Sequence, residues 1–143
     1  MAIQWIDSID GLDWAGLAAL YRAAPLGDKK PDDLKLVFTN SLYRCLAADD
    51  GRLVAAGRAL ADGRDCAYLA DIAVLPSYQG RGLGAEVVQR LLERCKGHRK
   101  IILYAVPGRE SLYARHGFRR MRTAMAIFAD QEAAYARGYL HDD

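Results

Sequence analysis

Hydrophobic side chains recur along this sequence with two different spacings, and the changes between them mark out successive elements. The stretch IQWID, residues 3–7, alternates apolar and polar positions like a β-strand. The later stretch LDWAGLAALYRAA places Trp14, Leu17 and Tyr21 on one helical face, and Pro25 ends it. The pattern therefore predicts a first strand followed by a helix.

A second helix is predicted to begin at Pro31, in the stretch PDDLKLVFTNS. Proline suits the first helical turn, and Asp32 and Asp33 follow it where the helix dipole favours acidic groups. One face of this helix would consist of Leu34, Val37, Phe38 and Ser41.

Three strand-like runs follow and are joined by turn signals. YRCLAAD and RLVAAGRALA flank the turn at Asp49–Gly51, and residues 61–65, ADGRD, form a second turn into CAYLADIAVL. The last run ends at Pro76. This order predicts an antiparallel meander.

Alternating helices and strands are predicted for the remainder of the chain. The clearest helix is closed by Gly97, and its apolar stripe consists of Leu83, Val87, Val88, Leu91, Leu92 and Cys95. KIILYAV is predicted as a buried strand, GRESLYARHGF as a short helix and RTAMAIFA as a last strand, while the tail QEAAYARGYLHDD is left open as a helix or a frayed end. No repeat or linker is evident, so we expect one domain over residues 1–143.

Composition is typical of a folded, globular protein. Of the 143 residues, 52% are hydrophobic and 27% charged, and the net charge is only +2. Nucleic-acid binders usually carry a denser basic patch, so the local cluster HGFRRMR, residues 116–122, indicates a solvated face or an anion site. The N-terminus lacks a signal-peptide pattern and no run is long enough to span a membrane, so neither nucleic acid nor membrane is expected as a partner.

The three cysteines exclude two further classes of site. Cys45, Cys66 and Cys95 are odd in number and lack the CxxC spacing of a disulfide framework or zinc site. They favour a reducing, cytoplasmic location without a metal, and core packing is the simpler role for each thiol.

The stretch LPSYQGRGLGAEV places Gly80, Gly82 and Gly84 at alternating positions, with Arg81 between two of them. A simple strand-to-helix turn needs fewer glycines. The pattern fits the dinucleotide fingerprint G-x-G-x-x-G/A, but residues 77–79 separate the strand from the first glycine, and the next strand lacks the acidic residue that would bind a ribose. A Walker P-loop would need Gly-Lys-Ser/Thr here.

A third interpretation is a different kind of pyrophosphate site. Backbone N–H groups from Gln79 to Ala85, together with the N-terminus of the following helix, can converge on an anion to which Arg81 adds charge. Glycines allow phosphates to approach these amides closely.

These residues resemble the acetyl-CoA motif of the GNAT superfamily of N-acetyltransferases, Q/R-x-x-G-x-G/A, which reads here Gln79-Gly80-Arg81-Gly82-Leu83-Gly84. The stretch SLYARHGF, residues 111–118, is similar to a second GNAT motif. DIAVLPSYQG is similar in particular to a branch of small GNATs that includes plant chloroplast serotonin and lysine acetyltransferases. The element order agrees along nearly the whole chain.

The resemblance implies an α/β (α+β) fold in which a central, mostly antiparallel mixed sheet is splayed at the cofactor site and flanked by helices. It also implies acetyl-CoA as cosubstrate and no metal. The cofactor-binding residues would be Ala73, Val74, Gln79, Gly80, Arg81, Gly82, Leu83, Gly84 and Ala85, the first two through backbone groups. Many members have an asparagine that contacts the pantetheine where this chain has Val106, so that contact would be absent or supplied otherwise.

Two residues are candidates for catalysis. Acetyl transfer needs a neutral amine, donors for the oxyanion and a proton for the leaving thiolate. The resemblance places Tyr113 beside the CoA sulfur, and a phenol that is protonated at neutral pH can act as the general acid. Asp71 interrupts the apolar run YLADIAVL and could bind the amine or relay its proton. Packing for Tyr113 and a structural hydrogen bond for Asp71 are the alternatives.

The leading functional hypothesis is therefore an acetyl-CoA-dependent N-acetyltransferase in which a primary amine, from a small molecule or a lysine side chain, attacks the thioester directly. The acceptor site would lie by the first two helices, where Tyr21, Phe38 and Trp5 could line it or belong to the core. A GNAT that uses another acyl-CoA and a CoA-binding sensor or interaction module without turnover are the alternatives. An apolar last strand at a sheet edge would need a cover, either a second copy in a homodimer or the C-terminal tail.

Overall fold

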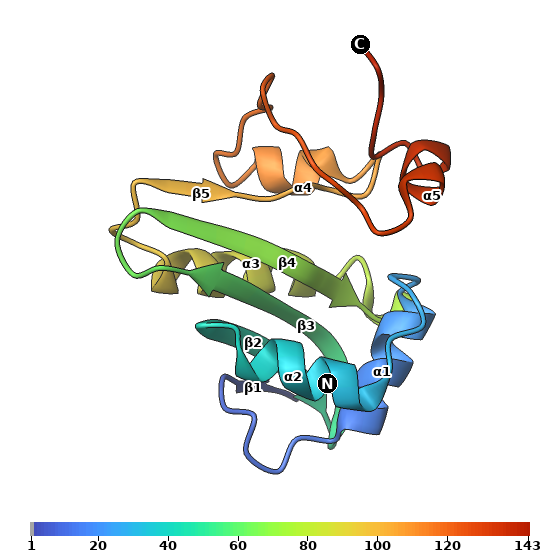
Figure 1. The fold of residues 1–143 in the computed structure, drawn as a ribbon. Coiled ribbons are helices and arrows are strands. Elements are labelled where there is room, and N and C mark those ends of the chain that lie inside the picture. The colour runs from blue at the N-terminus through green and yellow to red at the C-terminus, as the bar shows by residue number, and fades with distance from the viewer. Residues whose placement is uncertain (1) are drawn as a thin grey trace. The chain divides into compact units, whose positions relative to one another are not determined.

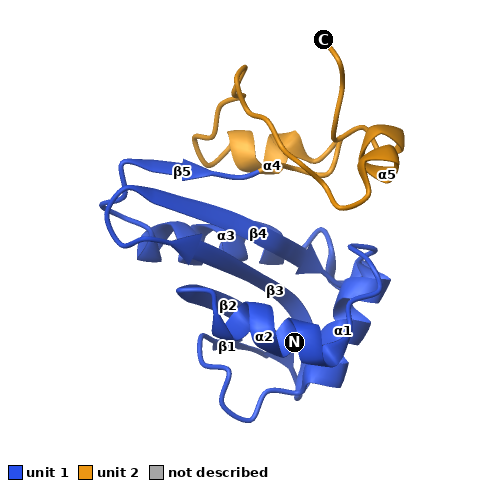
Figure 2. Cartoon of the chain, viewed as in Figure 1, with its two compact units in different colours: residues 1–103 blue, residues 104–143 orange. Residues whose placement is uncertain are grey.

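The computed structural model describes residues 2–143, which form two compact units (Figure 2). The first extends to Leu103, and the second is Tyr104–Asp143. Each is described by itself.

A five-stranded sheet forms the centre of the first unit (Figure 1). Its strands lie in sequence order, and each pair is antiparallel except β4–β5, which is parallel. The strands are β1 (Ile3–Ile6), β2 (Tyr43–Asp49), β3 (Arg52–Ala61), β4 (Cys66–Val74) and β5 (Lys100–Ile102). The predicted meander of three antiparallel strands is confirmed by β2, β3 and β4.

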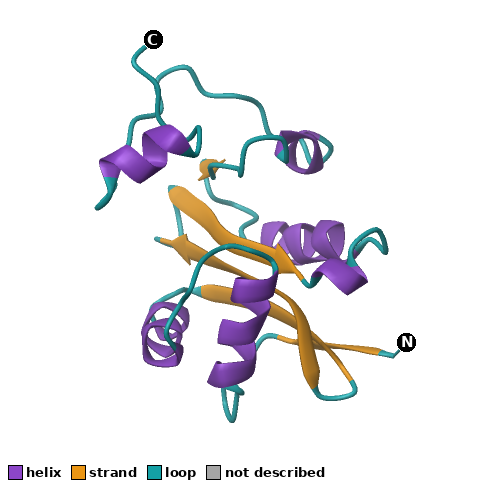
Figure 3. Ribbon diagram, turned by 90° about the vertical axis from the view of Figure 1, so that its right-hand side faces the viewer, coloured by secondary structure: helices purple, strands orange, loops and turns teal. Residues whose placement is uncertain are grey.

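Helices cover both faces of this sheet (Figure 3). α1 (Trp14–Ala23) and α2 (Pro31–Thr39) pack together on one face, and α3 (Leu83–Arg94) packs on the other. Asp13 accepts a hydrogen bond from the Gly16 N–H at 3.0 Å and so caps α1. The largest fully buried side chains are Tyr21, Phe38, Leu17, Leu20, Leu34, Leu46, Leu69, Leu91, Val54, Val87, Val88 and Cys95. The mixed fold predicted from the sequence is confirmed.

α3 packs closely against Gly57 of β3. A Cβ added there would lie 2.8 Å from Val87 Cγ1 and 3.1 Å from Leu91 Cδ1, closer than side chains tolerate. Opposite Gly57, the β3–β4 register shifts, so that Asp71 and Ile72 form a β-bulge in β4. Glycine is therefore required for the packing of α3 beside this bulge.

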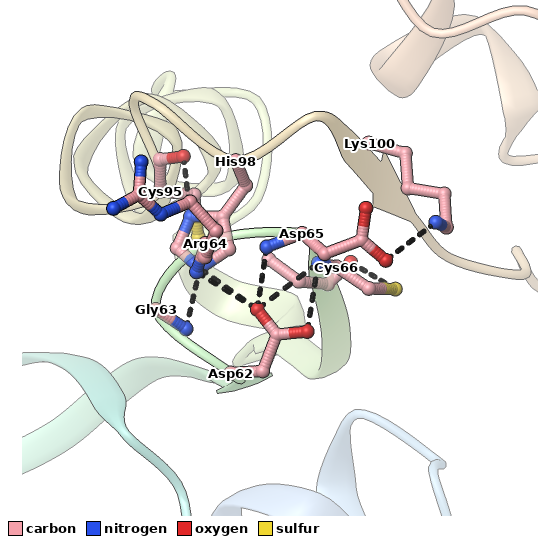
Figure 4. Close-up of polar contacts among 9 residues, drawn as sticks. Asp62, Gly63, Arg64, Asp65, Cys66, Cys95, His98 and Lys100 are labelled. Atoms are coloured by element: carbon pink, nitrogen blue, oxygen red, sulfur yellow. Dashed lines mark hydrogen bonds and ion pairs between the residues drawn. The ribbon is translucent and has the colours of Figure 1, made fainter.

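The turn between β3 and β4 is held by side chains at the opposite end of β4 from the glycine loop (Figure 4). Asp62 Oδ1 accepts the backbone N–H groups of Arg64 and Asp65 at 2.8 and 2.7 Å, and these bonds lower the pKa of Asp62. The Gly63 N–H donates to His98 Nε2 at 3.0 Å, which leaves Nδ1 as the donor to the Cys95 carbonyl at 2.8 Å. His98 thus joins this turn to the end of α3.

The second unit contains two short helices, α4 (Glu110–Ala114) and α5 (Gln131–Ala136). α5 answers the question left open for the tail, since Asp130 caps it by accepting the Ala133 N–H at 3.0 Å. The rings of Tyr104, Phe128 and Tyr139 pack against one another, with centroids 5.3 to 6.0 Å apart.

Two strand predictions were wrong in extent or in kind. KIILYAV forms a strand only over Lys100–Ile102, and RTAMAIFA, residues 122–129, forms none within residues 2–143. Apolar alternation shows that a segment suits a sheet, but a strand also requires a neighbour for its backbone groups. Residues 122–129 have no such neighbour in the described chain.

The three cysteines are free, and Cys45 and Cys95 are buried. Burial raises the pKa of the Cys45 thiol to about 11, so this thiol is inert at neutral pH. The helices of residues 2–143 are too short or too polar to cross a bilayer, and the longest, α3, has 12 residues.

Candidate active site

The glycine loop connects β4 to α3 (Figure 1). It begins with a single 3₁₀ turn, η1 (Pro76–Tyr78), and continues through Gly80 and Gly82, whose φ angles are +80° and +82°. L-residues with a side chain are strained in this left-handed region. Apart from the glycine itself and its two chain neighbours, no atom lies within 4 Å of a Cβ built at either position, so the loop has open space beside its backbone.

The loop ends at the N-terminus of α3, which has no side-chain cap. Gly82 is the N-cap residue, and the first hydrogen bond of the helix runs from the Glu86 N–H to the Gly82 carbonyl at 3.0 Å. The N–H groups of Leu83, Gly84 and Ala85 therefore have no partner within the helix, and the helix dipole favours an anion beside them. With the open space at the glycines, this arrangement fits the pyrophosphate of a CoA.

Two hydrogen bonds and a cation–π contact that the sequence did not suggest hold this loop in place. The Tyr78 hydroxyl donates to Asp49 Oδ2 at 2.6 Å, so the loop is tied to the turn between β2 and β3. Gln79 Nε2 donates to the Val74 carbonyl at 3.2 Å. The Arg81 guanidinium lies 4.9 Å from the centroid of the Tyr78 ring, a cation–π geometry. The hydrogen bond between Tyr78 and Asp49 could not be predicted from the sequence, because the two residues lie far apart in it.

β4 has a free edge next to the loop. Its pairing with β5 covers only Cys66, Ala67 and Tyr68, and within residues 2–143 no strand pairs with the rest of this edge. The Leu75 N–H donates to the Val54 carbonyl of β3 at 2.8 Å. Because backbone groups alternate in direction along an antiparallel strand, the Val74 N–H points to the free edge.

The same alternation directs the Ala73 N–H toward β3, where Ala73 is paired with Ala56. Of the two residues that the resemblance singled out for backbone contacts, Val74 is therefore the one whose amide can reach a ligand. The predicted splaying of the sheet corresponds to this early end of the β4–β5 pairing.

Asp71 lies in the bulge of β4 in an unusual backbone conformation. Its φ angle is +57°, and in the described chain only Asp50 shares a positive φ among residues other than glycine. The Tyr21 hydroxyl donates to the Asp71 carbonyl at 2.7 Å and stabilises this conformation. Burial, and then the charge of Asp71, raise the pKa of Tyr21 well above its ordinary value, so Tyr21 remains a donor. Strain of this kind tends to persist at functional sites.

The Asp71 carboxylate already has two cationic partners. Arg58 Nε donates to Oδ2 at 2.8 Å, and Lys29 Nζ lies 3.6 Å from Oδ1. An isolated general base would have neither. Neither partner was predicted from the sequence, although Arg58 interrupts the apolar run RLVAAGRALA just as Asp71 interrupts its own strand.

Tyr113 belongs to the second unit, on α4, whereas Asp71 belongs to the first. Tyr113 is half-buried, and its ring lies 6.1 Å from Phe118 in an edge-on geometry. Burial raises the pKa of Tyr113, and the opposing effect of the Arg109 charge is smaller. The phenol is therefore protonated at neutral pH, as a general acid requires.

The aromatic residues considered for the acceptor site belong to other surroundings. Tyr21 and Phe38 are fully buried and in contact, with ring centroids 6.5 Å apart. The Arg90 guanidinium lies over the Trp5 ring, 4.3 Å from the centroid of that ring. Tyr21 contacts Asp71 through its hydroxyl, and Phe38 belongs to the hydrophobic core.

Metal ligands are not clustered in the described chain: no group of three or more His, Cys, Asp or Glu side chains in residues 2–143 is arranged to hold an ion. In the first unit, the candidate groups are thus the backbone amides of the glycine loop and the side chains of Asp71, Arg58 and Lys29.

Comparisons with known proteins show which family the chain resembles. The chain is 34% identical over 117 residues to a chloroplastic serotonin N-acetyltransferase of Oryza sativa subsp. japonica, a match that covers 78% of this chain and 58% of that protein. It is 35% identical over 94 residues to glucosamine 6-phosphate N-acetyltransferase 1 of the same plant, covering 58% of this chain and 57% of the relative. The chain thus spans little more than half the length of these relatives.

A solved structure from Staphylococcus aureus, described as a probable acetyltransferase, shares the fold with a TM-score of 0.82 at 23% identity, over 90% of this chain and 99% of that one. Residues 13–118, from α1 into the second unit, match the acetyltransferase (GNAT) family. On this match the chain belongs to the GNAT family of acetyltransferases.

Proposed function

We propose that this protein transfers an acetyl group from acetyl-CoA to a primary amine. The observation that carries the proposal is the open glycine loop at the uncapped N-terminus of α3, beside the free edge of β4. The loop amides would bind the pyrophosphate of CoA. The pantetheine would lie along the free edge, where the Val74 N–H is available.

The reaction is a direct attack. The neutral amine nitrogen bonds to the thioester carbonyl carbon, and the tetrahedral oxyanion accepts a hydrogen bond from a backbone N–H such as that of Val74. The carbon–sulfur bond then breaks, and the amine nitrogen loses a proton to solvent or to a base. Free CoA leaves as the thiol.

Tyr113 is proposed to protonate the departing thiolate. Its raised pKa keeps the phenol protonated at neutral pH, and because a free thiol titrates near 8.5, below an ordinary phenol, the transfer to the thiolate is uphill and is completed by reprotonation of the phenolate. Solvent then returns a proton to the phenol.

Asp71 is proposed as a positioning residue more than as a base. Arg58 and Lys29 both contact its carboxylate, and its backbone forms part of the bulge in β4. Of the two roles weighed from the sequence, these contacts support the structural one.

The acceptor is a small-molecule amine or a lysine side chain. The relatives named for serotonin and for glucosamine 6-phosphate support a small-molecule amine. Another acyl-CoA as donor, and a CoA-binding sensor without turnover, are the alternatives to test.

A single assay separates these possibilities. The protein is incubated with acetyl-CoA, propionyl-CoA or succinyl-CoA and a panel of primary amines, and the release of free thiol is followed. Amine-dependent release of free thiol from acetyl-CoA supports the proposal. Faster release of thiol from propionyl-CoA or succinyl-CoA would identify that thioester as the acyl donor instead. CoA binding measured by calorimetry, with no release for any amine, supports the sensor.

We also propose that the protein forms a homodimer through residues 122–129. This segment is unpaired, and Met125 and Ile127 are 96% and 95% exposed. In the second unit, the C-terminal tail covers Phe128, which stacks on Tyr139, but it leaves those two side chains exposed. A second copy would cover them.

A further inference from the structure

One cluster of charges in the first unit has more positive than negative groups. It consists of Lys29, in the loop between α1 and α2, Arg58 on β3 and Asp71 on β4. Arg58 Nε lies 2.8 Å from Asp71 Oδ2, and Lys29 Nζ lies 3.6 Å from Asp71 Oδ1. The side chains of Arg58, Asp71 and Lys29 are 15%, 20% and 29% exposed.

Two cations thus share one carboxylate in a partly buried position. The nearby acid Asp28 does not offset the excess, because it pairs with Arg22 at 3.3 Å. The other end of the Arg58 guanidinium donates to the neutral Ser41 hydroxyl at 3.3 Å. Charge effects are stronger here than in bulk water, since partial burial reduces screening. A cationic group would be repelled at this cluster and an anionic one attracted.

Lys29 is the member of the cluster that is able to bind a ligand. Arg58 is held by Asp71 and Ser41 and is the least exposed, whereas Lys29 is the most exposed and has the longer contact. An ammonium group has three donors on a flexible stem, so it can contact Asp71 and a second anion together. The Tyr21 ring, 5.6 Å from Nζ, supports this position.

The cluster lies close to the place where the acetyl group would react. Asp71 is three residues before Val74 on the same strand, which is roughly 10 Å in a fully extended chain and less across the bulge. We propose that the acceptor is a primary amine that also bears a carboxylate or phosphate, and that Lys29 binds this anionic group. This inference rests on the proposed acetyltransferase activity, and it names the class of acceptor.

The test uses matched acceptors that differ in the anionic group: glucosamine 6-phosphate with glucosamine, and tyrosine with tyramine. The wild-type protein is expected to favour the anionic member of at least one pair, in kcat/KM, by roughly tenfold to a hundredfold, as a charge-assisted hydrogen bond would give. The pair that responds distinguishes phosphate from carboxylate. In Lys29→Met the ratio of kcat/KM for the anionic acceptor to that for the neutral acceptor should fall toward one, mainly because KM for the anionic acceptor rises. Lys29→Arg should restore most of the ratio.

Lys30→Met is the matched control, since Lys30 is the adjacent, exposed lysine and should not alter the preference. Inorganic phosphate should compete with the acceptor in the wild type and much less in Lys29→Met. The inference is overturned if the neutral amines are equal or better substrates, or if Lys29→Met keeps the wild-type preference.

The anion site can also be tested if the protein turns out to have no acetyltransferase activity. If CoA binds but no amine reacts, calorimetric titration of the CoA complex with inorganic phosphate still decides the matter. Loss of phosphate binding in Lys29→Met, with retention in Lys30→Met, would support the anion site. Equal binding in all three proteins would reject it.

Discussion

The Tyr78 hydroxyl donates a hydrogen bond to Asp49 Oδ2 at 2.6 Å, and this contact ties the glycine loop to the turn between β2 and β3. The hydrogen bond to Asp49 also raises the pKa of Tyr78, so the phenol keeps its proton. The Arg81 guanidinium in turn lies over the Tyr78 ring in a cation–π contact. One side chain thus orients both the backbone and the cation of the proposed pyrophosphate site.

Removing this hydroxyl should weaken cofactor binding without removing the ring. In Tyr78→Phe the stacking with Arg81 is kept and the tether is lost, so we expect the Kd for CoA to rise roughly three- to tenfold. Calorimetry measures this. Tyr43→Phe is the control, because Tyr43 also stacks with an arginine, Arg94, but away from the loop. Equal CoA affinity in Tyr78→Phe and the wild type would show that the loop needs no tether.

Gly84 offers a test of the pyrophosphate site that separates binding from folding. It lies in the first turn of α3, not among the residues with positive φ, so alanine is compatible with its backbone. We expect Gly84→Ala to keep the melting temperature and Gly84→Val to lower it slightly. Both should weaken CoA binding by more than about tenfold if phosphates approach this backbone. A folded Gly84→Val protein with unchanged CoA affinity would contradict the proposed site.

The role of Tyr113 as the acid can be tested by removing its hydroxyl. Tyr113→Phe is expected to lower kcat by roughly a hundred- to ten-thousandfold, as for other lost general acids, with little change in CoA affinity. Tyr135→Phe is the control, since the Tyr135 hydroxyl is also in the second unit but donates to Asp142. If kcat is the same in Tyr113→Phe as in the control, Tyr113 only packs against Phe118.

The pH dependence of kcat should reflect the raised pKa of Tyr113. Burial favours the neutral phenol, so the proton that it donates remains bound until the pH passes above about 10, its ordinary value. The rate should therefore rise with pH as the acceptor amine loses its proton and then stay level up to about pH 10. A decline in kcat beginning near pH 8, with the protein still folded by circular dichroism, would assign the acid to another group.

Self-association should depend on the exposed segment 122–129. Light scattering is expected to give a mass about twice the 15.8 kDa of one chain, and Ile127→Lys should reduce it to one chain. Leu36→Lys is the control, because Leu36 is also exposed, at 60%, but lies on α2. A single chain of the wild-type protein at micromolar concentration would reject the dimer. Association after deletion of the residues beyond Asp130 would then identify the tail as the cover.

Local sequence was sufficient for the elements that carry their own signals. The bounds of β2 and β3 follow from the apolar runs on either side of the turn at Asp49–Gly51, where Asp50 and Gly51 have the positive φ angles that such a tight turn requires. α3 follows from its apolar stripe. The glycine loop was evident for the same reason, since its conformation depends on residues that are adjacent in the chain.

Tertiary structure alone decided the surroundings of the reactive groups. Asp71 appeared from the sequence as a lone carboxylate in a strand, but Tyr21 contacts its carbonyl from 50 positions away, and Arg58 and Lys29 contact its carboxylate. The 122–129 segment has the composition of a strand and forms none, because backbone pairing depends on a neighbour that its own residues cannot specify. Periodicity and turn chemistry act between residues close in sequence, whereas charge pairing and sheet edges depend on distances that only the folded chain creates.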